Sequence, residues 1–418
     1  MAHHLCQVGY KRLIERLNRA PQGAPPSHLL YRILCLLVNE AEADRLARLP
    51  IWPFSAATAA RAWNLSTDRA RALLERLADR ALLLDIQTNG RTLYVLPPPM
   101  AGFFEFSLMR VRGDIDQHLL SELLYQYINI EEDFVGDLFF GGSTRLGRIF
   151  VRENALAAQP SVQILDHERA SQVIRQAEAI GVSLCYCRHK MSHLGRACDA
   201  PQEICMTFNT VAAALLRNGF ARRVDAVEAL DLLGQARQHR LVQFGENVRQ
   251  RVNFICHCCA CCCEALGAVR RFGLAQPLAP APFLPRVIDD RCNGCEHCAG
   301  VCPVSAVTPN PDGQPCVETD RCLGCGICAA ECPRQAIVME RRERLPLTPL
   351  NTAHRTVLMA IERGRLQHLI LDTHLTHHHR ALNAVLGAIL SLSPLQQVMA
   401  ASQLGSRCLE RLMARHNY

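Results

Sequence analysis

Cysteine is the residue type that could do chemistry in this chain, because 22 of its 418 residues are cysteines and 18 of these form four clusters between Cys185 and Cys332. Clustered thiolates are soft ligands for iron, zinc and copper. A small disulfide-bonded secreted scaffold does not fit a chain of this length, and Met1–Cys6 lacks the basic start and apolar stretch of a signal peptide. We therefore expect a cytoplasmic protein whose cysteines bind metal.

Two of the clusters repeat one spacing, C-x2-C-x2-C-x3-C-P. The first consists of Cys292, Cys295, Cys298, Cys302 and Pro303, and the second of Cys322, Cys325, Cys328, Cys332 and Pro333. In each run three thiols wrap a loop around one face of a cluster, and Gly294 and Gly324 allow the tight turns. The fourth cysteine begins a short helix. The spacing predicts two [4Fe-4S] clusters, against the alternatives of zinc knuckles or buried thiols.

The paired runs resemble the bacterial dicluster [4Fe-4S] ferredoxins over about 55 residues. The resemblance implies a βαβ repeat and one-electron transfer at low potential. It also implies that the fourth cysteine of each run reaches the other cluster. One cluster is then held by Cys292, Cys295, Cys298 and Cys332, and the other by Cys322, Cys325, Cys328 and Cys302.

Two further clusters of cysteines precede the paired runs. They comprise Cys185, Cys187, Cys198 and Cys205, followed by Cys256, Cys258, Cys259, Cys261, Cys262 and Cys263. The first four suffice for a third cluster, with Arg188 and Lys190 nearby to offset its negative charge, or they are buried structural thiols. The later six exceed the needs of one cubane. They indicate a fourth cluster, ligands shared with the first set, or zinc or copper binding.

The order of these segments, from a C-x-C-R motif through the cysteine-rich run and the ferredoxin pair to a helical tail, resembles a group of bacterial multi-cluster 4Fe-4S binding proteins. The resemblance covers about residues 160–418 and implies an electron carrier. It implies one or two additional Fe-S clusters besides the ferredoxin pair.

The elements that must position these thiols are expected in an α+β, mostly helical chain. Helices are expected at 27–46, 55–63, 69–80, 166–179, 209–218, 225–238 and 352–418, and a hairpin at 81–87 and 91–96. Asn89-Gly90 is a strong hairpin signal, and Ser66 is a candidate N-cap. The expected segments are 1–25 (helix and linker), 26–112 (winged-helix-like), 113–280 (helical, cysteine-rich), 286–340 (dicluster ferredoxin) and 341–418 (helical extension), with a linker at 276–285.

The composition limits the partners of the protein. Hydrophobic residues make up 49% and charged residues 20%, which excludes a disordered chain. The sequence contains no run of about 18 apolar residues, so we expect no membrane span. The net charge of +7 is too small to indicate nucleic-acid binding. His297 and the tract at His374 and 377–379 are expected to face solvent.

Three functions follow in order of preference. The first is an electron carrier that relays single electrons to an oxidoreductase partner. The second is a redox-sensing regulator that binds DNA through its winged helix; however, residues 66–80 carry four basic against three acidic side chains, which is a weak basic stripe. The third is an enzyme with an open cluster in the 256–263 run, and the surplus of thiols there argues against it.

Overall fold

The protein is a mixed α+β chain with several antiparallel sheets, seen here in a computed structural model that describes residues 8–156, 164–272, 277–311 and 313–370. It divides into two compact units. The first unit comprises Met1–Thr144, Ala213–Arg222 and Thr352–Tyr418, and the second comprises Arg145–Ala212 and Arg223–Asn351. The organisation into five segments stays a prediction. All four cysteine clusters belong to the second unit.

The first unit is mainly helical. Its elements are α2 (Val8–Asn18), α3 (His28–Leu37), α4 (Glu40–Ala47), β1 (Phe54–Ser55), α5 (Ala56–Trp63), α6 (Thr67–Ala78), β2 (Leu84–Thr88), β3 (Arg91–Val95), η1 (Pro99–Phe103), α7 (Phe104–Phe106), α8 (Gln117–Asn129), α9 (Glu132–Phe140), α17 (Thr352–Glu362) and α18 (Leu366–Ile370), and α12 (Asn209–Arg217) ends in it.

The hairpin between β2 and β3 is confirmed, and both turn residues, Asn89 and Gly90, have positive φ. Ser66 caps α6 by accepting a hydrogen bond from the backbone N–H of Arg69. The single helix expected at 27–46 is wrong, because the chain breaks after α3 and Asn39 restarts it as α4 with a capping box. The winged-helix interpretation of this region stays a prediction.

The second unit alternates strands with short helices. Its elements are β4 (Gly147–Phe150), η2 (Glu153–Ala155), η3 (Asp166–Glu168), α10 (Ala170–Gln176), β5 (Ile180–Leu184), α11 (Tyr186–His193), β6 (Glu203–Phe208), β7 (Arg222–Val224), α13 (Ala226–Gln238), β8 (Val242–Glu246), β9 (Phe254–Cys258), α14 (Glu264–Phe272), β10 (Phe283–Val287), η4 (Asp289–Arg291), α15 (His297–Gly300), β11 (Val307–Pro309), β12 (Pro315–Val317), α16 (Ile327–Ala330) and β13 (Ile337–Arg341).

A six-stranded sheet corrects the expectation that the cysteine-rich middle is helical. Its strands follow the order β4-β8-β9-β6-β5-β7, so the segment 166–260 contributes five of the six. The first four residues of β5 and all four of β4 are buried. A strand buried on both faces shows no polar alternation in its sequence, and this is why the sheet escaped detection.

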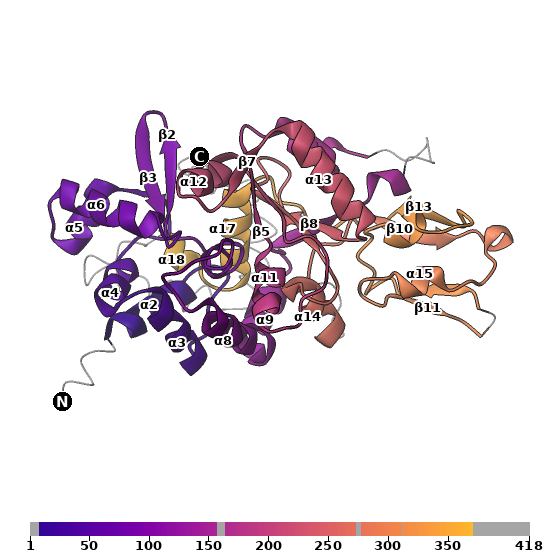
Figure 1. Ribbon diagram of the computed structural model, residues 1–418, viewed down its shortest axis with the longest axis horizontal. Helices are drawn as coiled ribbons and strands as arrows, with labels where there is room; N and C mark the ends of the chain where they lie inside the picture. Colours follow the sequence, from indigo (N-terminus) through magenta and orange to yellow (C-terminus); the bar gives the residue numbers. More distant parts are fainter. Residues whose placement is uncertain (1–7, 157–163, 273–276, 312, 371–418) are drawn as a thin grey trace. The chain divides into compact units, whose positions relative to one another are not determined.

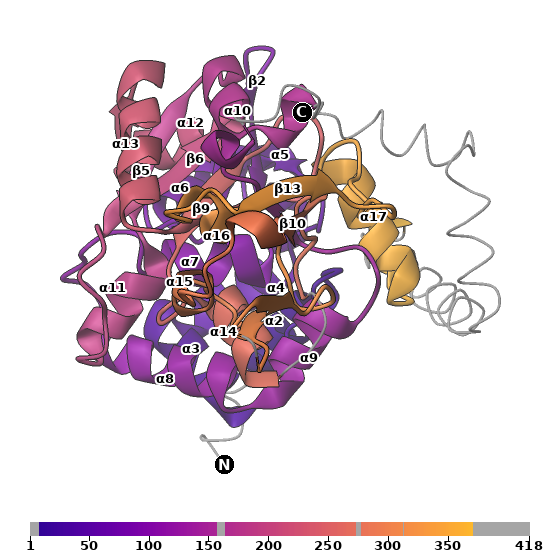
Figure 2. The ribbon, with the colours of Figure 1, turned by 90° about the vertical axis from the view of Figure 1, so that its right-hand side faces the viewer.

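Helices α10 and α13 pack on this sheet and build the core of the unit (Figure 2). Ile174 of α10 and Leu233 of α13 contact a buried layer that includes Val182, Met206 and Ile255 from β5, β6 and β9. Full burial of an aliphatic side chain contributes about 1.5–3 kcal/mol. The packed layer therefore holds these three central strands, whose ends carry cysteines, in one fixed register.

The ferredoxin-like segment contains two strand-helix-strand repeats, β10-α15-β11 and β12-α16-β13 (Figure 1, orange). Strand β10 pairs with β13, and β11 pairs with β12, both antiparallel. Each small sheet therefore takes one strand from each repeat, and this exchange carries the end of each cysteine run toward the loop of the other.

The linker expected at 276–285 is wrong, because most of this segment is part of the fold. Leu278 and Ala281 are fully buried. Ala279 accepts a hydrogen bond from the backbone of Ile149 at 2.9 Å and donates one to Gly147 at 3.0 Å, along β4. The proline-rich segment is therefore a buried part of the fold that leads into β10, and not a free connection.

Residues 371–418 lie outside the described residues, and so do the histidine tract, Cys408 and most of the expected helical tail. Gly364 follows α17 with a positive φ, as a C-cap should. In the part of the chain that the structure covers, no helix combines the length and the apolar character that a membrane crossing requires.

Candidate metal centres

A cavity beside α15 is lined by four cysteines, three from the first run and one from the second. They are Cys292, Cys295, Cys298 and Cys332. Gly294 has a φ of +68°, which lets the loop turn back on itself between the first two thiols. His297 also lines this cavity and is half-buried, not free in solvent. Thiols from both repeats therefore meet in one cavity.

The remaining four cysteines of the pair gather around the second loop. Burial raises the pKa of the Cys325 thiol to about 12, and negative charge at Cys322 and Cys302 adds to this effect. Burial also raises the pKa of Cys328, with Cys302 again among the charges that act on it. Cys302 of the first run thus lies close enough to the second loop to influence its thiols.

Backbone amides donate hydrogen bonds to the sulfur atoms that begin the two short turns. The N–H of Ala306 lies 3.2 Å from Cys302 Sγ, and the N–H of Ala336 lies 3.3 Å from Cys332 Sγ. The two bonds are related by the internal repeat of the sequence. Amide donors to sulfur stabilise extra negative charge, which raises the reduction potential of a thiolate-bound cluster.

The two loops differ in how they are supported. In the second loop, the backbone carbonyl of Cys325 accepts a hydrogen bond from the backbone N–H of Arg152 at 2.9 Å. The backbone carbonyl of Cys322 accepts one from the side chain of Arg342 at 2.7 Å. In the first loop, by contrast, Cys295 and Glu296 are exposed. The second loop is therefore the inner one and the first is the outer one.

Six other thiols converge at one end of the large sheet, and we call them the six-thiol group: Cys185, Cys187, Cys205, Cys256, Cys258 and Cys263. Cys185 follows β5, and Cys187 lies in the first turn of α11. Cys256 and Cys258 share one face of β9 because side chains alternate along a strand. The pairing of Met206 with Ile255 brings Cys205 of β6 opposite Cys256.

Hydrogen bonds between thiols link the six-thiol group into a chain that runs from Cys256 through Cys205, Cys185, Cys187 and Cys263 to Cys258. Bonds to Cys185 and Cys263 raise the pKa of Cys187, and bonds to Cys185 and Cys256 raise that of Cys205. The pKa of Cys185, which these hydrogen bonds stabilise as a thiolate, is lowered. A raised pKa makes a thiol harder to deprotonate, and a metal ion that binds these thiols must displace their protons.

Two cations, which were expected from the sequence to offset the charge of a cluster, are buried near this chain of thiols. Arg188 has no exposed surface, and its Nη1 donates to the carbonyl of His257 at 3.0 Å and to Cys259 Sγ at 3.7 Å. Burial lowers the pKa of Arg188, but the nearby cysteines outweigh this effect and the net shift is upward. Lys190 is equally buried and forms an ion pair with Glu264, and burial lowers its pKa to about 8.

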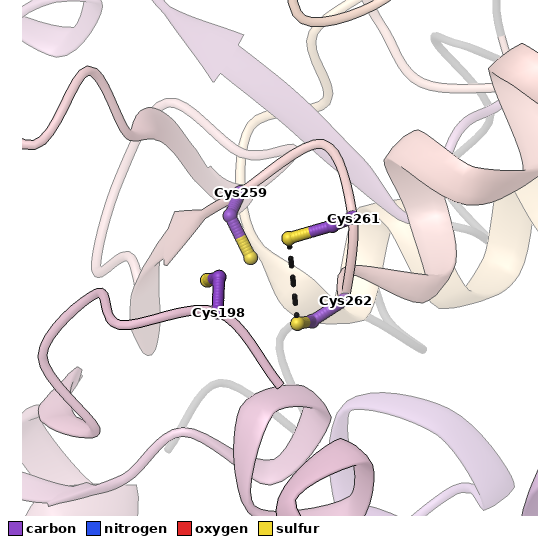
Figure 3. A group of neighbouring side chains, drawn as sticks. All are labelled: Cys198, Cys259, Cys261 and Cys262. Atoms are coloured by element: carbon purple, nitrogen blue, oxygen red, sulfur yellow. Dashed lines mark hydrogen bonds between the residues drawn. The ribbon is translucent and has the colours of Figure 1, made fainter. Parts of the chain in front are cut away.

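A separate set of four thiols, the four-thiol group, consists of Cys198, Cys259, Cys261 and Cys262. Their sulfur atoms all lie within 4.8 Å of one another. Figure 3 shows three of them on the turn after β9 and Cys198 on a different loop facing them. Cys198 thus shares a possible metal site with thiols of the 256–263 run. Of the alternatives for the 256–263 run, the structure favours ligands shared between the two segments.

His257 is a polar residue in this region that the sequence interpretation passed over. It is fully buried, and burial lowers its pKa to about 3. Neither ring nitrogen has a hydrogen-bond partner among the described residues. A signal was present in the sequence, because alternation along a strand places the middle residue of Cys256-His257-Cys258 on the face opposite the two thiols.

Comparison with known proteins supports part of this picture. A family model described as a 4Fe-4S binding domain matches residues 315–338. No curated protein and no solved structure matches the chain. The matched residues contain the second cysteine run and belong to a segment similar to 4Fe-4S binding domains. The match indicates an iron-sulfur protein, and the four-thiol group is a second place in the chain that could hold a metal ion.

Proposed function

We propose that the protein is an electron carrier that relays single electrons through two ferredoxin-type [4Fe-4S] clusters, and through a further cluster in the six-thiol group, to an oxidoreductase partner. The observation that carries this proposal is the cavity lined by Cys292, Cys295, Cys298 and Cys332. Four thiols drawn from two repeats are the ligand set that a ferredoxin-type cubane requires.

The ligand sets of the two clusters are crossed in this proposal. Cys332 completes the outer cluster, and Cys302 completes the inner cluster with Cys322, Cys325 and Cys328. Support comes from the influence of Cys302 on the pKa of Cys325 and Cys328. The antiparallel pairing of β10 with β13 supplies the geometric reason, because it overlays the end of one repeat on the start of the other.

Each bound cluster would supply a one-electron redox centre, and the chain would set its potential. Amides of Ala306 and Ala336 donate to thiolate sulfur, and Arg342 donates to the carbonyl of Cys322. Positive charge and donors near sulfur favour the reduced cluster. The exposed outer loop gives a protein partner access to one cluster. The inner loop is covered by other residues of the second unit, including Arg152.

The number of cysteine ligands at each site fits an electron carrier better than an enzyme. An open catalytic iron needs fewer than four protein ligands, whereas each ferredoxin set has four thiols and the six-thiol group has two more than a cubane uses. A DNA-binding role gains little from α6, where Arg71 lies 3.7 Å from Asp68 in an ion pair. A salt-dependent gel shift on genomic DNA fragments would be the observation that revives that alternative.

The test combines cysteine substitutions in the full chain, purified without oxygen. Wild-type protein should contain at least about eight irons and eight sulfides, and Cys332→Ser should lose about four of each. Adding Cys292→Ser to Cys332→Ser should cause no further loss, whereas adding Cys322→Ser should remove the second cluster as well. EPR after dithionite reduction would follow each cluster.

Cys316→Ser is the matched control, because this exposed cysteine lies in the same segment but outside both sets. It should retain all the iron. Iron-free wild-type protein, or a Cys292→Ser and Cys332→Ser pair whose losses add, would contradict the proposal.

A further inference from the structure

The thiols of the four-thiol group lie close enough together to bind one ion. Its four sulfur atoms lie within 4.8 Å of one another, and those of Cys261 and Cys262 are 3.5 Å apart. A tetrahedral zinc ion with bonds of about 2.3 Å places its thiolates about 3.8 Å apart. In a cubane each thiolate binds a different iron, so the sulfur atoms spread further. We propose that Cys198, Cys259, Cys261 and Cys262 bind a single zinc ion without sulfide.

The local backbone favours one small ion. Cys259, Cys261 and Cys262 lie in a tight turn that connects β9 to α14, and Cys198 approaches from the connection between α11 and β6 (Figure 3). Three ligands in four consecutive residues leave little room for an inorganic core between them. Soft thiolate ligands in a tetrahedral arrangement select zinc over hard cations such as magnesium and calcium.

The surroundings supply the charge that such a site requires. Four thiolates around Zn²⁺ leave a net charge of −2, and buried charge needs a partner. Arg188, which has no exposed surface, donates to Cys259 Sγ at 3.7 Å. The same guanidinium binds the carbonyl of His257, which is flanked by Cys256 and Cys258 of the six-thiol group. One cation therefore supports both centres.

Four thiolates close the coordination sphere, so this zinc would be structural. Zinc has no accessible redox change, so it would carry no electrons. Its role would be to fasten the 194–202 connection to the 259–262 turn. That turn lies directly between Cys258 and Cys263, which both belong to the six-thiol group. Fixing the turn would fix the positions of two ligands of the neighbouring redox centre.

The experiment measures zinc, iron and sulfide together in the full chain, purified anaerobically. Wild-type protein should contain one zinc per chain. Cys261→Ser and Cys198→Ser should each weaken zinc retention at least about tenfold against a chelator, while the eight or so irons of the ferredoxin pair remain. Cys261 is exposed, so its substitution leaves the buried core in place. Cys35→Ser, another exposed cysteine, is the matched control and should keep its zinc.

Cobalt gives an independent readout. Growth with cobalt should replace the zinc and give the absorption of a tetrahedral thiolate-bound ion, and Cys261→Ser should abolish it. Wild-type protein without zinc, or variants that lose about four irons and four sulfides and keep their zinc, would overturn the assignment. This test can fail independently of the ferredoxin test, because Cys332→Ser is assessed by its iron content and Cys261→Ser by its zinc content.

Discussion

The ferredoxin pair and the cysteine-rich end of the large sheet assemble their thiols in opposite ways. In the pair, short loops of fixed spacing present three thiols each, and Cys332 of the second run joins the three thiols of the first loop in one cavity. At the sheet end, ten thiols arrive from β6, β9, α11 and the connections between elements, and only the tertiary structure sorts them into groups of six and four. Local spacing therefore identifies the first kind of site, whereas strand register determines the second.

The largest loss of stability is expected from a substitution in the inner loop, which is packed tightly against its neighbours. A Cβ on Gly324 would lie 2.2 Å from the carbonyl oxygen of Phe283, and its φ of +68° is strained for other residues. Gly324→Ala should destabilise the segment by on the order of 5 kcal/mol and release the inner cluster. Iron content and thermal unfolding would measure it.

Gly294→Ala is the matched variant in the outer loop. Gly294 has the same φ of +68°, but the nearest atom to an added Cβ is 3.4 Å away. The cost should be only the backbone strain of about 1–2 kcal/mol. Equal losses in the two variants would contradict the distinction between an inner and an outer loop.

The next effect concerns the sheet end alone. Arg188→Leu removes a buried cation that contacts Cys259 and the backbone of His257, and it should destabilise the loaded protein by about 3–5 kcal/mol. Arg188→Lys keeps the charge and should recover part of the loss. Anaerobic denaturant unfolding would measure both. The iron of the ferredoxin pair should be unchanged, and its loss would show that the two regions are not independent.

A smaller effect should appear as a pH dependence of stability. The native pKa of His257 is about 3, against 6.5 for an unhindered histidine. Between these values the unfolded chain binds a proton that the native chain does not, so stability falls as the pH falls, by about 1.4 kcal/mol per unit. His257→Leu should flatten the unfolding free energy between pH 6.5 and 5. His239→Leu, at an exposed position, should keep the slope of the wild type.

The smallest effect is expected where a cysteine lies outside every group. Cys316 is exposed on β12 and lines neither the outer cavity nor the turns that carry the other thiols. Cys316→Ser should change stability by less than about 0.5 kcal/mol and leave the iron, sulfide and zinc contents unchanged. A loss of metal in this variant would show that sequence spacing does not separate ligands from bystanders.

Prediction from the sequence succeeded where structure is local. The turn at Asn89-Gly90 and the cap at Ser66 need only their neighbours in the chain, and both are where the sequence placed them. The break after α3 also had a local signal, the capping box of Asn39 and Glu42, which the long apolar pattern obscured.

Prediction from the sequence failed where contacts between distant segments determine the structure. The strands β4 and β5 are covered on both faces, so no alternating pattern distinguishes them from buried helix. The position of Cys205 opposite Cys256 depends on the pairing of β6 with β9, and Cys185 follows the irregular register between Ser183 and Leu184. Neither feature can be read from the spacing of the cysteines.

The exchange of strands between the two ferredoxin repeats limits how this segment can be altered. Because β10 completes its sheet with β13, and β11 with β12, an isolated half would leave two strands without partners, and the cavity beside α15 would lose Cys332. Neither half can therefore keep its strand pairing without the other. A substitution that shifts either half should therefore register in the spectra of both clusters at once.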